Sequence, residues 1–314
     1  MTPHVATTAH RRTDTGLDVV TGAFSYSGSA IANRLLAQGR AVRTLTGHSD
    51  RAPLGSPIDV RSLDFADLPG LVRALDGATT LYNTYWVRFA HGRTDHALAI
   101  ENSRALFHAA RQAGVQRIVH VSITNPSIDS PYPYFRGKAL VERALAETGV
   151  GYTILRPAIL FGGNGVLVNN IAWLLRRLPV FAVGGDGHYR IRPIHVDDLA
   201  DLALASALDV DDRIVDAVGP DRPTFTELVL AVRDAVGSRA RVVRIPGAFL
   251  PPISSVLNRM LRDVLLTRDE YHAMADGLAD TDGADTAPTR ITDWLAEHAA
   301  TLGLHYANEL QRHY

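Results

Sequence analysis

Tyr134 and Lys138 stand four residues apart at the start of a segment whose pattern predicts a helix over residues 134–147. Residues at this spacing lie on one face of a helix, so the phenol and the ammonium can act on a common ligand. A phenol has a pKa of about 10, and a nearby ammonium favours the phenolate, which brings proton transfer toward neutral pH. Lys138 can also hydrogen-bond a ribose. The pair predicts a catalytic acid/base site.

Lys138 is the only lysine in a chain that otherwise carries its positive charge on 31 arginines. With ten tyrosines in the sequence, a single lysine would have tyrosine four places before it by chance in about 3 of 100 cases. An arginine cannot present a compact ammonium. That Lys138 is the only lysine favours a specific role for it.

A phosphate-binding turn is predicted where residues 18–28 run from a strand through small residues into a helix. Such a turn offers free backbone N–H groups and the positive end of a helix to an anion such as a pyrophosphate. The spacing Gly22, Ser25, Gly28 matches Gly-x-x-Gly-x-x-Gly with serine in the middle place. The alternative is a tight strand-to-helix turn that binds nothing.

The second predicted strand ends in Thr46, Gly47 and His48, with no acidic residue to hold the ribose hydroxyls of NAD. This absence favours NADP(H) over NAD(H). His48 or Arg51 can meet the 2′-phosphate, although Arg51 is equally well a solvated loop charge.

Asp64, after the next short strand, can accept a hydrogen bond from the adenine amino group, or it caps the helix that follows. Together with neighbouring positions, these residues form the predicted cofactor-binding set: Gly22, Phe24, Ser25, Tyr26, Gly28, Thr46, His48, Arg51, Asp64, Phe65, Thr84, Lys138 and Pro157.

Two further hydroxyls, those of Ser122 and Thr124, lie where the strand predicted from Arg117 to Ser122 ends. This is the carboxyl edge of the sheet, where sites in parallel sheets form. One of them can hydrogen-bond a substrate oxygen, or both satisfy loop backbone. Predicted substrate contacts are Trp86, Arg88, Asn125 and Arg192. The alternatives are that Trp86 only covers the lobe interface and that, near Arg192, His195 is structural and Asp198 caps the next helix.

The fold that must position these residues is α/β, a doubly wound parallel Rossmann sheet with a smaller, mostly helical C-terminal substrate lobe. Short apolar runs alternate with helix-period segments from Leu17 onward. Strands are predicted at residues 18–21, 41–45, 80–83, 117–122 and 152–156, and helices near 27–38, 66–75, 94–113 and 134–147.

The chain is expected to divide into three parts. These are a flexible N-terminus (1–16), a dinucleotide-binding domain (17–160) and a substrate lobe (161–314), with part of 190–220 returning to the Rossmann sheet. In the lobe, a helix is predicted at Val166 to Arg177, and Thr224 to Glu227 and Thr267 to Glu270 read as capping boxes. Residues 279–288 are expected to form a flexible loop.

Composition excludes several classes of protein. The chain has 314 residues, 46% of them hydrophobic, a net charge of −1 and no cysteine. It can bury a full core, but it offers no basic field for nucleic acid and no disulfide, thiolate metal site or cysteine nucleophile. No metal site is predicted. With no secretory signal and no membrane span, we expect a cytoplasmic protein acting on a small molecule.

An apolar stripe at helical spacing is formed by Ile253, Val256, Leu257, Met260, Leu261, Val264 and Leu265. Packing against the second lobe is the default expectation, and a homodimer contact is an alternative. Membrane attachment is the least favoured, because the polar face carries only Arg259 and Arg262 as cations.

Several of these motifs together resemble the extended and atypical branches of the short-chain dehydrogenase/reductase superfamily, over residues 17–205. The resemblance is nearest to the NAD-dependent epimerase/dehydratase group, the NmrA-like proteins and the complex I nucleotide-binding accessory subunit. It rests on Thr21-Gly22 through Gly28, Asn102, Ser122, Tyr134-x-x-x-Lys138, Arg156-Pro157-x-x-x-Phe161-Gly162 and His195-Val-Asp-Asp198.

The resemblance implies that Tyr134 is the acid/base, that Lys138 orients the nicotinamide ribose, and that Ser122 or Thr124 polarises a substrate carbonyl. This sequence departs from the pattern at Ser25 and at Ile123, the place where many extended members carry the catalytic hydroxyl. The expected function is hydride transfer to or from a carbonyl or secondary alcohol. The alternatives are an epimerase or dehydratase with tightly retained NAD(P), and a non-catalytic NAD(P)-binding sensor or scaffold.

Overall fold

The computed structural model describes residues 16–92, 94–163 and 165–313. The expected flexible N-terminus therefore lies outside the described residues, apart from Gly16. By its internal contacts the chain forms two compact units. Unit 1 comprises residues up to 121 with 137–155 and 200–215, and unit 2 comprises 122–136, 156–199 and 216–314. Each unit is described by itself.

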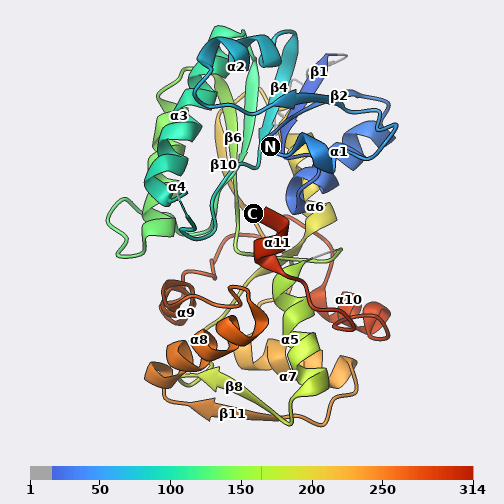
Figure 1. Cartoon of the computed structure of the whole chain (residues 1–314), viewed down its shortest axis with the longest axis vertical. Coiled ribbons are helices and arrows are strands. Elements are labelled where there is room, and N and C mark those ends of the chain that lie inside the picture. The colour runs from blue at the N-terminus through green and yellow to red at the C-terminus, as the bar shows by residue number, and fades with distance from the viewer. Residues whose placement is uncertain (1–15, 93, 164, 314) are drawn as a thin grey trace, which may run out of the picture. The chain divides into compact units, whose positions relative to one another are not determined.

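A seven-stranded sheet organises unit 1, in the order β10-β6-β5-β4-β1-β2-β3 (Figure 1). The pairs from β3 through β6 are parallel. The order reverses between β1 and β4, which makes their carboxyl ends the switch point where ligands bind such sheets. The strands are β1 (Leu17–Thr21), β2 (Ala41–Thr46), β3 (Asp59–Ser62), β4 (Ala78–Asn83), β5 (Arg117–Val121), β6 (Gly151–Pro157) and β10 (Arg213–Ala217).

Helices cover both faces of this sheet, because its strands are apolar and buried on both sides. On one face, α2, α3 and α4 share a single apolar cluster with the strands, built around Leu71, Leu106, Phe107 and Val141. On the other face, Arg34 of α1 forms an ion pair with Asp201 of α6. The helices are α1 (Tyr26–Ala37), α2 (Leu68–Leu75), α3 (His96–Gln112), α4 (Pro133–Ala146) and α6 (Val196–Ser206). The predicted fold class is confirmed.

Buried Arg117 ties the last strand pair together. Its guanidinium donates to the carbonyls of Tyr152, Ser206 and Asp211 and to the hydroxyl of Thr153, at 2.7 to 3.0 Å. These acceptors lie on β6, at the end of α6 and in the turn before β10, so one side chain fixes the segment that carries β10 into the sheet. Five hydrogen-bond donors on a rigid plane suit arginine to this task.

Unit 2 is a mixed lobe, with more strand than a mostly helical lobe would have. Two short parallel sheets pair β7 (Ile159–Phe161) with β9 (Pro193–His195), and β8 (Val180–Gly184) with β11 (Arg241–Ile245). The helices are α5 (Val166–Arg177), α7 (Phe225–Ala235), α8 (Leu250–Leu261), α9 (Arg268–Ala275), α10 (Ile291–His298) and α11 (Glu309–His313). A separate apolar core joins α5, α7 and α10 around Phe161 and Trp294.

The local signals in this lobe were accurate. Helix α5 has the predicted bounds, and both capping boxes are present, with the Thr224 and Thr267 hydroxyls accepting from the backbone three residues on. The expectation that the apolar stripe at residues 253–265 packs inward was wrong. Ile253, Val256 and Met260 are exposed and the other members are only half-buried, whereas the buried residues of α8 are Leu250 and Ser254, outside the predicted stripe. Within the described residues, no helix is long and apolar enough to cross a membrane.

Candidate functional site

The turn between β1 and α1 depends on two glycines. Gly22 has φ +64°, in the left-handed region that glycine adopts without strain. A Cβ on Gly28 would lie 2.2 Å from the carbonyl oxygen of Gly22. The first turn of α1 therefore sits directly against the backbone of the loop, and only a residue without a side chain permits it.

Ser25, in the place of the middle glycine, stabilises this turn from inside. Its amide and its hydroxyl both donate to the Gly22 carbonyl, at 2.8 and 2.6 Å. As the residue before α1 it makes no side-chain cap, and the first turn of the helix contains no acidic residue. The positive end of the α1 dipole is therefore not offset by an acid from its own first turn, which fits an anionic ligand.

Neighbouring strands hold the turn in place. The amide of Gly22 donates to Leu45 O at 2.9 Å, and that of Ala23 donates to the Thr44 hydroxyl at 3.0 Å. At the end of β4, the Thr84 hydroxyl donates to Thr21 O at 2.7 Å. Thr84, predicted as a cofactor contact, thus lies beside the turn.

A pocket of about 550 Å³ opens next to this turn. Ala23 and Phe24 of the turn, Asn33 of α1 and Arg51 line it, together with the loop 53–58. Arg51 is exposed and ends a short 3-10 turn, Ser49–Arg51. The pocket is large enough for part of an adenosine. Sequence reasoning missed the loop 53–58, whose proline and glycine residues indicated only a turn.

Other predicted cofactor residues lie at the same sheet edge. Thr46 is buried, and its hydroxyl accepts from the amide of exposed His48 at 3.0 Å. Exposed Asp64 accepts from the amide of Ala66. The cap of α2 is Asp67 instead, which accepts from Gly70 N at 2.9 Å, so the alternative role for Asp64 as helix cap is wrong. The ring of Phe65 packs on Tyr85, with centroids 4.7 Å apart.

Lys138 is one of the buried charged residues of unit 1, with only 2% of the residue exposed. Its Nζ donates to Val121 O, at the end of β5, at 2.9 Å. The same atom lies 4.8 Å from the centre of the Trp86 ring. Burial lowers the pKa of Lys138 to about 7, against the opposing effect of the Glu142 carboxylate. In this structure the ammonium bonds backbone, and its predicted bond to a ribose stays a prediction.

Sequence reasoning did not identify the polar link beneath Lys138. Asn83, at the end of β4, donates through Nδ2 to Nδ1 of His120 on β5 at 3.0 Å. His120 is fully buried, and burial followed by the charge of Lys138 holds its pKa well below the usual value. Its Nε2 has no hydrogen-bond partner among the described residues. The sequence signal that could have revealed this hydrogen bond is a histidine inside an apolar strand.

The aromatic segment after β4 covers Lys138. A Cβ on Gly137 would meet the Trp86 ring at 2.8 Å, so the ring lies directly on α4. Trp86 also stacks on His96, with centroids 5.8 Å apart. Arg88, the neighbouring predicted substrate contact, lies over the ring of Phe89 at 5.7 Å. Trp86 thus covers the ammonium, and its predicted contact with a substrate stays a prediction.

Tyr134 is in α4, one helical turn before Lys138, as predicted. It is half-buried and packs edge-on against Phe135, with centroids 5.7 Å apart. Its neighbour Tyr132 has a different environment. The Tyr132 hydroxyl donates to Asp276, and desolvation together with this bond raises the pKa of Tyr132 to about 12.

The two candidate hydroxyls after β5 differ in their partners. The Ser122 Oγ is buried and has no hydrogen-bond partner among the described residues. The Thr124 hydroxyl donates to Leu278 O at 2.9 Å, and its amide donates to the carbonyl of Pro157 at 3.0 Å. Thr124 and Pro157 are therefore joined by a backbone hydrogen bond. The Thr124 hydroxyl satisfies a backbone carbonyl, as the alternative to a substrate contact had it. Of the two hydroxyls, only that of Ser122 lacks a hydrogen-bond partner among the described residues.

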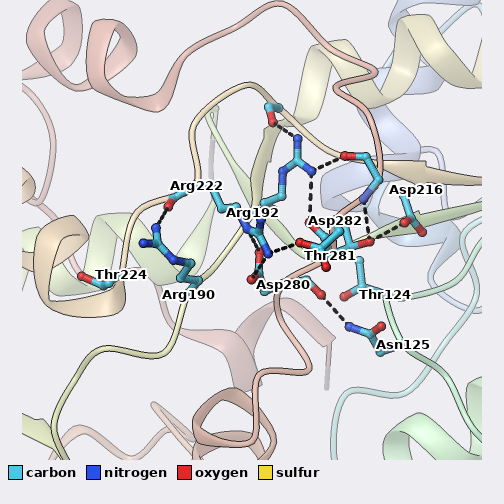
Figure 2. A network of polar contacts seen from close by, with 12 residues as sticks. Thr124, Asn125, Arg190, Arg192, Asp216, Arg222, Thr224, Asp280, Thr281 and Asp282 are labelled. Atoms are coloured by element: carbon cyan, nitrogen blue, oxygen red, sulfur yellow. Dashed lines mark hydrogen bonds and ion pairs between the residues drawn. The ribbon is translucent and has the colours of Figure 1, made fainter.

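Two predicted substrate contacts belong to a structural network in unit 2 (Figure 2). Asn125 donates to the carbonyls of Leu278 and Asp280. Arg192 is buried and donates to the carbonyls of Thr281, Gly283 and Gly219 and to the carboxylate of Asp285. Both side chains hold the loop 279–288. Arg192 is a buried donor to this loop and Asn125 is an exposed one, while the flexibility expected of residues 279–288 stays a prediction.

The comparisons with known proteins follow this geometry. The family model described as NAD(P)H-binding matches residues 22–171. An uncharacterised protein of Mycobacterium tuberculosis is 29% identical over 256 residues, which cover 80% of this chain and 27% of that protein. The 40 kDa subunit of NADH-ubiquinone oxidoreductase from Neurospora crassa is 29% identical over 174 residues, 54% of this chain and 45% of that protein. The chain thus spans less than half the length of these relatives.

Solved structures share the fold. The NADPH-dependent quinone oxidoreductase of Escherichia coli, in complex with NADPH, superposes with a TM-score of 0.71 at 21% identity, covering 90% of this chain and 98% of that one. A nucleoside-diphosphate-sugar epimerase of Staphylococcus aureus gives 0.70 at 19%, covering 89% and 99%. The chain is therefore similar to NAD(P)H-binding proteins over residues 22–171, and it shares the fold of these solved structures.

Replacing Gly28 with alanine is expected to weaken cofactor binding. The added Cβ meets the Gly22 carbonyl at 2.2 Å, so the turn must open, and we expect the Kd for NADPH to rise by at least about tenfold. Fluorescence titration with NADPH measures it. Gly39→Ala is the matched control, because Gly39 ends the same helix at φ +71° in open space and loses stability without touching the turn. Equal NADPH affinity in Gly28→Ala and wild type would contradict the assignment.

Replacing Lys138 with methionine is expected to stabilise the protein below about pH 7, by on the order of 1–3 kcal/mol, because a buried ammonium is costly. The folded pKa of about 7 lies below the ordinary value of 10.5. Wild-type stability therefore rises with pH between these two values, and the advantage of Lys138→Met shrinks across that window. Urea unfolding as a function of pH measures it. Exposed Arg143→Met should show no such trend, and a pH-independent advantage would exclude the burial argument.

Proposed function

We propose that this chain is an NAD(P)(H)-dependent oxidoreductase that acts on a carbonyl or secondary alcohol of a small organic substrate, with Tyr134 as the acid/base. The observation that carries the proposal is the turn formed by Gly22, Ser25 and Gly28. It offers a helix N-terminus without a first-turn acid and a backbone surface that a Cβ would fill. These features fit the pyrophosphate of a dinucleotide.

When bound, the cofactor supplies or accepts the hydride. The side chains of the protein would transfer the proton. Tyr134 would donate its phenolic proton to the substrate oxygen during reduction, and take it back during oxidation. The ammonium of Lys138 follows one turn later in α4, where it favours the phenolate. Its bond to Val121 O fixes its position, and Trp86 excludes water from it.

Ser122 is the proposed second contact to the substrate oxygen. A buried hydroxyl without a partner costs free energy in the unliganded protein. A hydrogen bond to a substrate carbonyl would recover that cost and polarise the carbonyl. Thr124 does not compete for this role, because its hydroxyl already donates to Leu278 O.

NADP(H) is the proposed cofactor in preference to NAD(H). β2 ends in Thr46 with no acidic side chain to repel a 2′-phosphate, and Arg51 lines the pocket next to the turn. An arginine fork matches a phosphate geometrically. The quinone oxidoreductase of the same fold was solved with NADPH.

The acid/base role is tested by Tyr134→Phe, assayed with NADPH against a panel of quinones, aldehydes and ketones. We expect turnover to fall by about 100-fold or more while the Kd for NADPH is unchanged, because only the proton donor is removed. Tyr132→Phe is the control, since it removes a hydroxyl two residues away that donates to Asp276. Turnover that survives in Tyr134→Phe would refute the role. NADPH binding without turnover in any protein would refute the oxidoreductase and leave a sensor.

The cofactor preference is tested by Arg51→Gln. We expect the Kd for NADPH to rise by about tenfold and that for NADH to stay constant, because only the former carries the 2′-phosphate. Calorimetric titration with both nucleotides measures the two values. Arg61→Gln serves as a control, since Arg61 is exposed and pairs with Asp59 outside the pocket. A parallel loss for NADH and NADPH would contradict a 2′-phosphate contact.

A further inference from the structure

One face of α8 in unit 2 exposes a row of large apolar side chains. Phe249 is 59% exposed, Ile253 41%, Val256 60% and Met260 74%. Their spacing of four, three and four residues places them in line on a single helix face. We call these four residues the α8 stripe. Contiguous exposed apolar surface of this kind marks an interaction site more often than isolated residues do.

The opposite side of α8 is already packed. Leu250 and Ser254 are buried, and the helix lies against β8 (Figure 1). The stripe is therefore a second face of α8, distinct from the face through which the helix packs on the rest of unit 2. The fold anchors α8 by one face and presents the other.

The segment that contains the stripe carries charge of a single sign. Residues 237–262 contain five arginines and no aspartate or glutamate, in a chain with 33 acidic residues and a net charge of −1. All five are exposed, and none forms an ion pair with any residue that the structure describes. They are Arg239, Arg241, Arg244, Arg259 and Arg262.

Four of these arginines come from two neighbouring elements, and Arg239 lies just before the second of them, β11. Arg259 directly precedes Met260 of the stripe, and Arg262 ends α8. Arg241 and Arg244 belong to β11, which pairs with β8, the strand on which α8 packs. The sequence suggested only the two cations of α8 itself. The β8–β11 sheet adds those of β11.

The acidic side chains that follow the segment in the sequence do not pair with its arginines. Asp263 is buried, where it accepts from the Tyr306 hydroxyl and from the amides of Glu309 and Leu310. Glu270 is engaged in the capping box of α9. Asp269, next to Arg268, is exposed on α9.

We propose that the α8 stripe and its arginines dock this protein onto an anionic lipid bilayer surface, with α8 lying in the plane of the interface. A bilayer offers an apolar layer directly beneath an anionic one, and a cation-flanked apolar helix face complements both at once. A second copy of the chain is a poorer match. In a twofold contact each stripe would face the same stripe, and the five arginines would face five arginines.

The test is flotation of the full chain with lipid vesicles. Wild type should bind vesicles of phosphatidylcholine mixed with phosphatidylglycerol, release them at high salt, and not bind phosphatidylcholine alone. We expect Val256→Glu/Met260→Glu and, separately, Arg259→Gln/Arg262→Gln to weaken binding by at least about tenfold. Val210→Glu is the matched control, because Val210 is 55% exposed in unit 1 and should leave binding unchanged.

Three results would overturn the proposal. They are no binding of wild type to anionic vesicles, binding that survives both double substitutions, and a wild-type dimer in light scattering that Val256→Glu/Met260→Glu dissociates. Thermal unfolding and NADPH titration of each variant report folding separately. Because NADPH binding uses the turn of unit 1, failure of the docking surface and failure of the oxidoreductase assignment give different results.

Discussion

The close approach of Gly28 to the carbonyl of Gly22 is the constraint on which the dinucleotide site depends. With 2.2 Å between that oxygen and any added Cβ, the first turn of α1 can press against the loop that follows β1. Ser25 then closes the loop with two hydrogen bonds to the same carbonyl. A serine in the middle position is compatible with this geometry because its hydroxyl turns inward to the loop backbone.

Burial of Lys138 is the second feature that shapes the chemistry. An ammonium held under Trp86 and bonded to Val121 O loses hydration, which lowers its pKa to about 7. Its charge in turn helps to keep His120 neutral. Functional sites often contain groups with shifted pKa values. Lys138, the only lysine of the chain, has such a shifted pKa.

Much of the fold was predictable from the sequence, because long helices and buried parallel strands carry strong periodic signals. The strands from β1 to β6 that were predicted agree within about two residues, and the capping boxes at Thr224 and Thr267 were found from four letters each. Interactions between partners that are distant in sequence were not predictable in this way. The anchoring of residues 279–288 by Arg192 and the clamp of Arg117 on Asp211 each join segments about 90 residues apart. The exposure of the α8 stripe likewise depends on tertiary packing, which the apolar periodicity of the sequence does not reveal.

A crystal structure of the chain with NADPH tests the central claim most directly. The pyrophosphate is expected against the backbone N–H groups of the turn at residues 22–28, with the adenosine in the pocket beside Arg51 and the nicotinamide beside Tyr134. A nucleotide bound elsewhere on the chain, or a nicotinamide remote from Tyr134, would contradict it.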